Sequence, residues 1–218
     1  MRAVIFDMDG ILIDTERWLN KYWCQAALEA GFAMKPEHAL AIRSLDGKLT
    51  EPYLQSIFGE EFDYQAIRNR RRELFNAHIE KYGVDKKPGV DEILDYLKEK
   101  GIKAAVATAT EPVRAKEYLT AIGVYEKFDK VISAKTVKNG KPAPDVYLFA
   151  CEELGEKPED CFAVEDSPNG IMSAYRAGLR VVMVPDLTEP DEETAKLLTK
   201  KVSKLDEMIP FLEEELKS

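Results

Sequence analysis

The chain has 218 residues, of which 45% are hydrophobic and 33% are charged, and its formal net charge is −9. The apolar content is enough for a folded core, but no apolar run approaches the ~20 residues that a membrane-spanning helix needs. The acidic balance argues against nucleic acid or an anionic membrane as the main partner. Only four apolar residues follow Arg2 before the first acidic one, so we expect no signal peptide and a cytoplasmic protein.

The first element is an apolar run typical of a buried parallel strand, and it stops at Asp7. The following stretch shows only helical periodicity, with helices expected at 18–30, 37–43, 50–58 and 64–82. A helical block directly after a buried strand is typical of an insertion. We therefore expect an all-helical domain at residues 15–83, inserted into a core domain formed by residues 1–14 and 84–218.

Beyond residue 88, strand and helix patterns alternate along the chain. Strands are expected at 103–107, 130–133, 161–164 and 181–184, and helices at 90–100, 113–122, 145–154, 171–177 and 202–216. Such alternation is typical of a doubly wound parallel sheet with right-handed crossovers. The predicted fold class is therefore α/β, with a Rossmann-like core and a helical insertion.

Chemically reactive groups follow three of the predicted strands. Parallel strands place their carboxyl ends at one edge of the sheet, which is where open α/β sheets bind ligands. These groups and one loop lysine should therefore face a common crevice: Asp7, Asp9, Thr108, Thr110, Glu165, Asp166 and Lys141. Carboxylate oxygens combined with water are the ligands that Mg²⁺ selects. The sequence thus predicts a magnesium site at this edge.

The same groups are suited to phosphoryl transfer without a histidine or serine nucleophile. The carboxylate of Asp7 can attack phosphorus and form an aspartyl-phosphate, which splits one difficult step into two. Asp9 lies two residues further along an extended segment and points the same way. It is placed to protonate the leaving alcohol and then to activate water. Thr108 and Lys141 can hold the remaining phosphoryl oxygens.

The sequence resembles the haloacid dehalogenase superfamily in all four of its signature motifs. These are Asp7-Met8-Asp9-Gly10, Thr108, Lys141 within Lys-Pro-Ala-Pro-Asp, and Glu165-Asp166-Ser167. The helical block after the first strand is similar to the cap of β-phosphoglucomutases and related sugar-phosphate phosphatases. The resemblance covers essentially the whole chain, and it implies the same Rossmann-like core with an inserted helical cap.

The resemblance also implies the role of each motif residue. The catalytic residues are Asp7 as nucleophile, Asp9 as general acid and base, and Thr108 and Lys141 as holders of the phosphate. Magnesium is expected on Asp7, the backbone carbonyl of Asp9 and Asp166, with Glu165 in or next to that shell.

Substrate contacts are expected in two places. Near the phosphate we expect Gly10, Thr15, Ala109 and Thr110. In the helical block, Arg43, Ser44 and Lys48 flank the turn Asp46-Gly47 and are predicted to form a substrate loop, with solvated loop charges as the alternative. A run of basic residues further on is predicted to form a solvated helix face: Arg68, Arg70, Arg71 and Arg72.

Two positions favour a phosphatase over a mutase. The mutases that this chain resembles carry a histidine where Leu19 stands and a lysine where Glu111 stands. Exchanging a cation for an anion weakens the binding of a bisphosphate. We therefore predict a monomeric, magnesium-dependent phosphatase of small phosphorylated metabolites, sugar phosphates in particular. The alternatives are a β-phosphoglucomutase and, from a different class, a non-catalytic phosphometabolite sensor.

Overall fold

The computed structural model describes residues 1–217 and is built around one parallel sheet. The strand order is β3-β2-β1-β4-β5-β6, and every neighbouring pair is parallel. The strands are β1 (Ala3–Phe6), β2 (Lys103–Thr108), β3 (Lys130–Ser133), β4 (Cys161–Glu165), β5 (Arg180–Met183) and β6 (Lys200–Lys201). The first strand of the chain therefore lies in the middle of the sheet, between β2 and β4. The predicted α/β fold class is confirmed.

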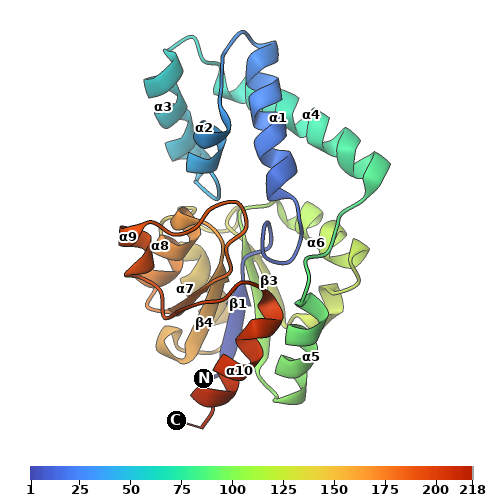
Figure 1. Ribbon diagram of the computed structural model, residues 1–218, viewed down its shortest axis with the longest axis vertical. Helices are drawn as coiled ribbons and strands as arrows, with labels where there is room; N and C mark the ends of the chain where they lie inside the picture. Colours follow the sequence, from blue (N-terminus) through green and yellow to red (C-terminus); the bar gives the residue numbers. More distant parts are fainter. Residues whose placement is uncertain (218) are drawn as a thin grey trace.

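The helices divide between the sheet and a separate helical block. The block contains α1 (Glu16–Glu29), α2 (Pro36–Ala41), α3 (Gly47–Phe58) and α4 (Tyr64–Tyr82). The helices of the α/β part are α5 (Val90–Glu99), α6 (Pro112–Ala121), α7 (Asp145–Leu154), α8 (Pro168–Arg176), α9 (Glu192–Ala195) and α10 (Met208–Glu215). Short 3₁₀ turns occupy Tyr125–Lys127, Pro158–Asp160 and Leu205–Glu207. Figure 1 shows α1 to α4 together above the end of the sheet toward which β1 runs.

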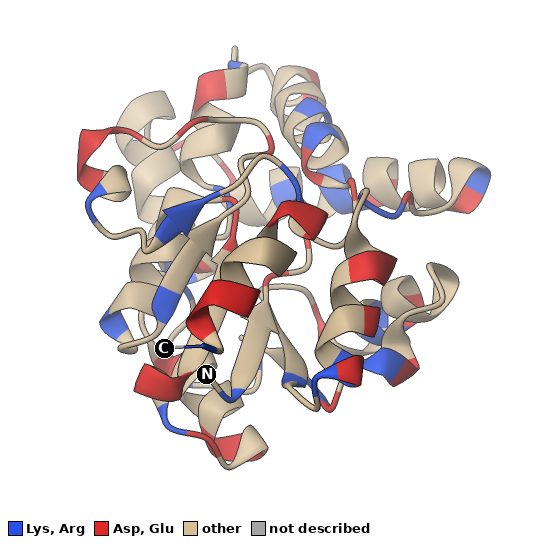
Figure 2. Ribbon diagram, turned by 60° about the horizontal axis from the view of Figure 1, so that its bottom comes forward, with Lys and Arg blue, Asp and Glu red and all other residues tan. Residues whose placement is uncertain are grey.

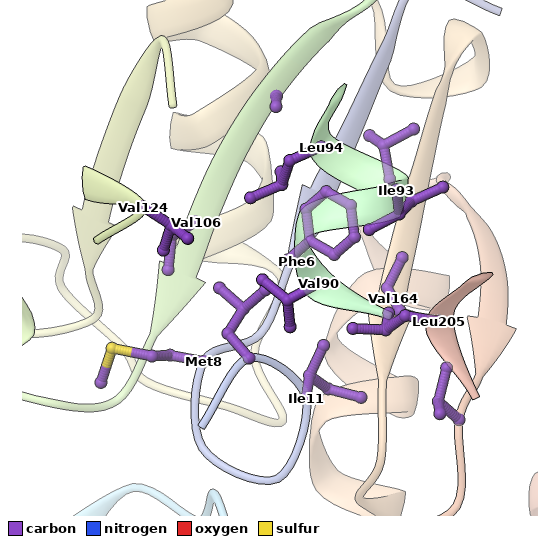
Figure 3. Close-up of a cluster of buried hydrophobic side chains, with 14 of the residues drawn as sticks. Phe6, Met8, Ile11, Val90, Ile93, Leu94, Val106, Val124, Val164 and Leu205 are labelled. Atoms are coloured by element: carbon purple, nitrogen blue, oxygen red, sulfur yellow. The ribbon is translucent and has the colours of Figure 1, made fainter. Parts of the chain in front are cut away.

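The alternation of side chains along β1 divides the core into two layers. Val4 and Phe6 join the cluster on the face covered by α5 and α10, whereas Ala3 and Ile5 join the cluster under α7 and α8. Figure 3 shows the ring of Phe6 among apolar side chains that include Ile93 on α5. Because β1 is fully buried on both faces, the residue that follows Phe6 is placed by the core itself.

The helical block has a hydrophobic cluster of its own. Its buried members come from all four helices and the connections between them, and they include Trp23, Leu54, Phe62 and Ile67. Acidic and basic side chains are interspersed over the outside of the molecule, with acids gathered on α10 near the C-terminus (Figure 2). No helix within residues 1–217 combines the length and the apolar character that crossing a membrane requires.

The helix expected over 202–216 is present, but it is shorter than that range. Lys200–Lys201 forms the edge strand β6, the backbone N–H of Val202 still bonds to the carbonyl of Met183 at 3.0 Å, and α10 begins only at Met208. Pro210 explains the late start, because proline lacks an N–H and is tolerated in the first turn of a helix but not in its interior.

Candidate active site

The candidate site begins where β1 leaves the core. Phe6 is paired with Val106 of β2 and Val164 of β4, and the N–H of Asp7 continues this pattern by bonding to the Val164 carbonyl at 2.9 Å. The side chain of Asp7 is almost completely buried. The carboxyl ends of three adjacent strands thus converge around this carboxylate, as the sequence predicted.

A tight turn follows, and its conformation depends on Gly10. The φ angle of Gly10 is +83°, in the region that favours glycine. A Cβ atom at this position would also lie 2.5 Å from Oδ2 of Asp166. The glycine therefore lets the backbone pass directly beside a buried carboxylate.

Lys141 is the main counter-charge of the site. Its Nζ atom donates to Oδ1 of Asp7 at 2.9 Å, to Oε1 of Glu165 at 2.7 Å and to the carbonyl of Ala107 at 2.9 Å. Burial alone would lower the pKa of Lys141, but Asp7 and Glu165 more than offset it and raise that pKa, so the ammonium stays charged. A cation from a distant loop is therefore fixed between two strand ends.

Glu165 is engaged mainly by hydrogen-bond donors. Its Oε1 accepts from Lys141 and from the hydroxyl of Tyr147 at 2.6 Å, and its Oε2 lies 3.4 Å from the hydroxyl of Ser167. Burial raises the pKa of Glu165 to about 7, although Lys141 opposes the shift. Tyr147, which the sequence reasoning did not single out, thus belongs to the site as a partner of this carboxylate.

The site also contains buried carboxylate oxygens that accept no hydrogen bond. One oxygen each from Asp7, Glu165 and Asp166 lie within 4.8 Å of one another. Within residues 1–217, Oδ2 of Asp7 and both oxygens of Asp166 are buried without a hydrogen-bond partner. Arg43 lies close to Oδ2 of Asp166, so Oδ2 of Asp7 and Oδ1 of Asp166 are the two atoms with neither a hydrogen bond nor an ion pair in the described part of the chain. Burying polar atoms without partners is costly. An oxygen-rich, electron-rich cage of this kind fits a hard divalent cation such as Mg²⁺.

Asp9 lies in a different environment from Asp7. Its Oδ1 accepts from the hydroxyl of Thr15 at 2.5 Å, and its Oδ2 accepts from the hydroxyl of Thr110 at 2.8 Å. Burial raises the pKa of Asp9, the two hydroxyl groups oppose this, and the charge of Asp7 adds to the rise. Thr15 and Thr110 were both expected to contact the substrate, and in this structure they orient Asp9. Thr108 is fully buried, and its hydroxyl accepts from the N–H of Thr110 at 3.1 Å.

The three residues that were expected to form a substrate loop lie in different surroundings in the structure. Arg43 is buried: its Nη1 lies 3.1 Å from Oδ2 of Asp166, and its Nη2 donates to Thr188 at 2.7 Å. Ser44, with a φ angle of +58°, lines the same cavity as Asp7. Lys48 instead faces away from that cavity and donates to the carbonyl of Lys138 at 3.1 Å.

The turn between these residues holds the helical block against the α/β part. Oδ2 of Asp46 accepts from the N–H of Gly140 at 2.6 Å, and the N–H of Asp46 donates to the carbonyl of Lys141 at 2.8 Å. From α8, the side-chain amide of Asn169 donates to the carbonyl of Arg43 at 2.9 Å. The loop that carries Lys141 is therefore positioned partly by the helical block.

A cavity of about 170 Å³ lies between the two parts. Asp7, Asp9, Ala109 and Thr110 line it on the α/β side. Glu16, which the sequence reasoning missed although it directly follows Thr15, also lines it, and burial together with Asp166 raises the pKa of Glu16 well above its usual value.

The prediction of a solvated face for the arginines of α4 is wrong at three of four positions. Arg68, Arg71 and Arg72 line the cavity, and only Arg70 lies outside it, where it pairs with acidic side chains. The spacing of the three, at i, i+3 and i+4, places them on one helix face and is the signal that could have revealed them.

Comparison with known proteins places this site in a family context. Residues 4–184 match the family described as "Haloacid dehalogenase-like hydrolase". The "Phosphorylated carbohydrates phosphatase" of Thermotoga maritima is 33% identical over 184 residues, which is 82% of this chain and 82% of that protein. The "Beta-phosphoglucomutase" of Bacillus subtilis is 30% identical over 193 residues, 84% of this chain and 83% of that protein.

A solved structure supports the same fold. The crystal structure of a β-phosphoglucomutase from Clostridium difficile is similar to this chain with a TM-score of 0.84 at 21% sequence identity, covering all of this chain (100%) and 97% of that one. At this level of identity the similarity concerns the fold.

The buried position of Lys141 generates a prediction about stability. Replacing Lys141 with Met leaves Asp7 and Glu165 without their shared cation, and we expect a loss of about 3–5 kcal/mol in the free energy of unfolding. Urea unfolding in the presence of EDTA measures this loss, and added Mg²⁺ should restore part of it. Lys127→Met is the matched control: Lys127 bridges Asp91 and Asp95 at the surface, so its loss should cost at most about 1 kcal/mol. Equal costs for the two variants would contradict the assignment.

Proposed function

The chain belongs to the haloacid dehalogenase-like hydrolase family, and from that premise we propose that it is a magnesium-dependent phosphatase of small phosphorylated metabolites. The single observation that carries the proposal is the free Oδ2 atom of Asp7, whose other oxygen contacts the ammonium of Lys141 and whose carboxylate lies near Asp166, where Oδ1 also has no partner among the described residues. A nucleophile, a counter-charge and a cation cage thus meet at one point of the cavity. The name of the Thermotoga maritima relative supports phosphorylated sugars as the substrate class.

In the first step, an oxygen of Asp7 attacks phosphorus as the bond to the leaving alkoxide breaks, which gives an aspartyl-phosphate. Lys141 contacts Asp7 directly, so it holds that carboxylate in place, and it can stabilise the charge that builds on the phosphoryl oxygens. Thr108 ends the neighbouring strand β2 and Thr110 lines the cavity, and we assign both to holding the same group. Glu165 acts through Lys141 and Tyr147, whose positions it fixes.

Asp9 supplies and removes the proton in this scheme. A carboxyl group with a raised pKa can be protonated when the substrate arrives, and it then gives its proton to the leaving alkoxide. The resulting carboxylate takes a proton from water, and the water oxygen attacks phosphorus, which releases inorganic phosphate and regenerates Asp7. The hydroxyl groups of Thr15 and Thr110 hold Asp9 in one orientation through both steps.

The cation site is assigned to Asp7, the backbone carbonyl of Asp9 and Asp166, with Glu165 adjacent. A bound Mg²⁺ would neutralise the two carboxylates together with the incoming phosphate, which otherwise repel one another. The fit rests on the unpartnered oxygens of Asp7 and Asp166. Because Lys141 and Tyr147 already occupy one oxygen of Glu165, we assign that residue chiefly to the support of Lys141.

We assign residues 15–83 to a helical cap domain and residues 1–14 and 84–218 to the core domain. The cap has its own hydrophobic cluster and meets the core through Arg43 and Asp46, and the cavity lies between the two domains. Closing the cap over bound substrate would exclude water from the phosphoryl group and strengthen the electrostatic interactions there.

A phosphosugar mutase is the second candidate, because a relative of that name is 30% identical to this chain. Leu19 and Glu111 both line the cavity, where the mutases that this chain resembles carry a histidine and a lysine. Without those two groups, water is the better acceptor for the phosphoryl group of Asp7, and we favour hydrolysis.

The proposal predicts metal-dependent turnover that needs Asp7. Purified protein should release p-nitrophenol from p-nitrophenyl phosphate in Mg²⁺ and lose this activity in EDTA, while Asp7→Asn should lower kcat by at least about 10⁴-fold. Glu152→Gln, at an exposed acid of α7, is the control and should retain activity. Wild-type turnover by Asp7→Asn would end the nucleophile assignment, and binding of phosphate esters without any turnover would favour the sensor.

A second variant tests the role of Asp9. We expect Asp9→Asn to lower steady-state kcat by about 10²–10⁴-fold, since both proton transfers are impaired. With p-nitrophenyl phosphate, whose leaving group needs little protonation, the variant should show a burst of p-nitrophenol and an acid-stable covalent phosphate on the protein. Rapid mixing followed by intact-mass analysis detects both; a uniformly slow reaction with no phosphoenzyme would assign the proton transfers elsewhere.

The products formed from a sugar phosphate separate the two candidate activities. Given β-glucose 1-phosphate, the phosphatase yields glucose and inorganic phosphate in equal amounts, whereas a mutase yields glucose 6-phosphate. We expect the first result, followed by ³¹P NMR. Accumulation of glucose 6-phosphate at a rate above phosphate release would show that Leu19 and Glu111 do not prevent transfer to a second sugar hydroxyl.

A further inference from the structure

Four arginine side chains line one part of the active-site cavity. Arg68, Arg71 and Arg72 come from one face of α4, and Arg114 comes from α6. The same cavity is lined by Asp7 and Asp9, so the arginines and the proposed nucleophile face a common space. They belong to different domains, since α4 lies in the cap and α6 in the core.

These arginines are poorly neutralised by the protein. Within residues 1–217, the one ion pair that any of them makes is between Nη2 of Arg72 and Oε1 of Glu111, at a distance of 3.8 Å. The Nε atom of Arg71 is buried and has no hydrogen-bond partner, while its guanidinium lies over the ring of Trp23 at 5.1 Å. Burial and the neighbouring Arg68 and Arg72 lower the pKa of Arg71 to about 10.

The neighbouring Arg70 shows what a surface arginine of the same helix does. Its Nε donates to Glu29 at 2.6 Å and its Nη1 donates to Glu73 at 2.9 Å, so its donors are satisfied outside the cavity. Like charges three and four residues apart on a helix are destabilising. The mutual repulsion of the arginines that face the cavity is therefore destabilising, and the rest of the protein does not offset it.

The structure leads to a different interpretation of Glu111 from the one that the sequence suggests. From the sequence, an acid at this position argues against a second phosphate on the substrate. In the cavity, however, its single charge stands against four arginines, with Arg72 as its ion-pair partner. The balance in this part of the cavity is positive, which favours an anion.

We propose that the substrate carries a second anionic group, which the guanidinium of Arg71 binds together with Arg68, Arg72 and Arg114 while the transferred phosphoryl group lies at Asp7. This inference rests on the proposed function, because that function places the scissile phosphate. The shared chemistry of the second group is an oxyanion, either a phosphate or a carboxylate. Guanidinium groups suit both, since their planar donors match two oxygens at once.

Matched substrates test the proposal and distinguish the two oxyanions. Fructose 1,6-bisphosphate is compared with fructose 1-phosphate and fructose 6-phosphate, and 6-phosphogluconate with glucose 6-phosphate. We expect at least one doubly anionic ester to exceed its singly phosphorylated partner by roughly tenfold or more in kcat/KM, as expected for a gained charged hydrogen bond. Equal or better hydrolysis of all the singly phosphorylated sugars would overturn the inference and leave the phosphatase function standing.

Variants of α4 then connect the preference to Arg71. Arg71→Gln should remove most of the preference for the doubly anionic ester, chiefly through KM, and Arg71→Lys should retain part of it. Arg70→Gln, one residue away on the outside of the helix, should leave the activity and the preference unchanged. An equal loss toward both kinds of ester in Arg71→Gln would assign Arg71 a structural role and overturn the inference.

A binding measurement tests the inference even if no ester is hydrolysed. Isothermal titration of the Asp7→Asn protein with fructose 1,6-bisphosphate in Mg²⁺ measures affinity without turnover. We expect Kd to rise roughly tenfold or more when Arg71→Gln is added to Asp7→Asn. An unchanged Kd overturns the inference by itself, whereas a raised Kd without hydrolysis of any ester supports the anion site and refutes the phosphatase.

Discussion

The arrangement of the candidate site depends on an excess of buried negative charge at the carboxyl edge of the sheet. Asp7, Glu165 and Asp166 are held there by strands that are buried on both faces, so the carboxylates cannot turn outward to water. One ammonium, that of Lys141, contacts two of them at 2.7–2.9 Å and is itself fully enclosed. Arg43 supplies a second cation at Asp166, so the three carboxylates face two positive charges and a net negative charge remains at this edge.

The same imbalance helps to position the helical block. Arg43 reaches from the end of α2 to Asp166, the carboxylate that Lys141 does not contact. The side chain of Asp46 accepts from the N–H of Gly140, and its backbone N–H donates to the carbonyl of Lys141, so the helical block also holds the loop that carries Lys141. Movement of the helical block would therefore act on two elements of the site at once. It would expose the cavity, and it would separate the guanidinium of Arg43 from the carboxylate of Asp166.

The cavity itself has two electrostatic ends. Around Asp7 and Asp9 the protein supplies carboxylates and one buried ammonium, an environment that accepts phosphate only together with a cation. Toward α4 the protein supplies guanidinium groups with a single acid, Glu111, beside them. A substrate with one charged end would complement only one end of the cavity, and a substrate with two oxyanions would complement both ends. Charge complementarity of this kind contributes to specificity as much as to affinity.

The sequence by itself determined the fold class, the position of β1 and the convergence of Asp7, Asp9, Glu165, Asp166 and Lys141, because strand period and parallel direction leave little choice about where the ends of buried strands point. Only the tertiary structure decided that Arg43 meets Asp166, that Lys48 faces outward, and that Arg71 rather than Arg70 faces the cavity. It also decided that the segment after Thr199 begins as an edge strand. The physical reason is that a largely polar helix lacks an apolar periodicity strong enough to fix which of its faces points inward. The elements that pack against it therefore determine which charged side chains are enclosed.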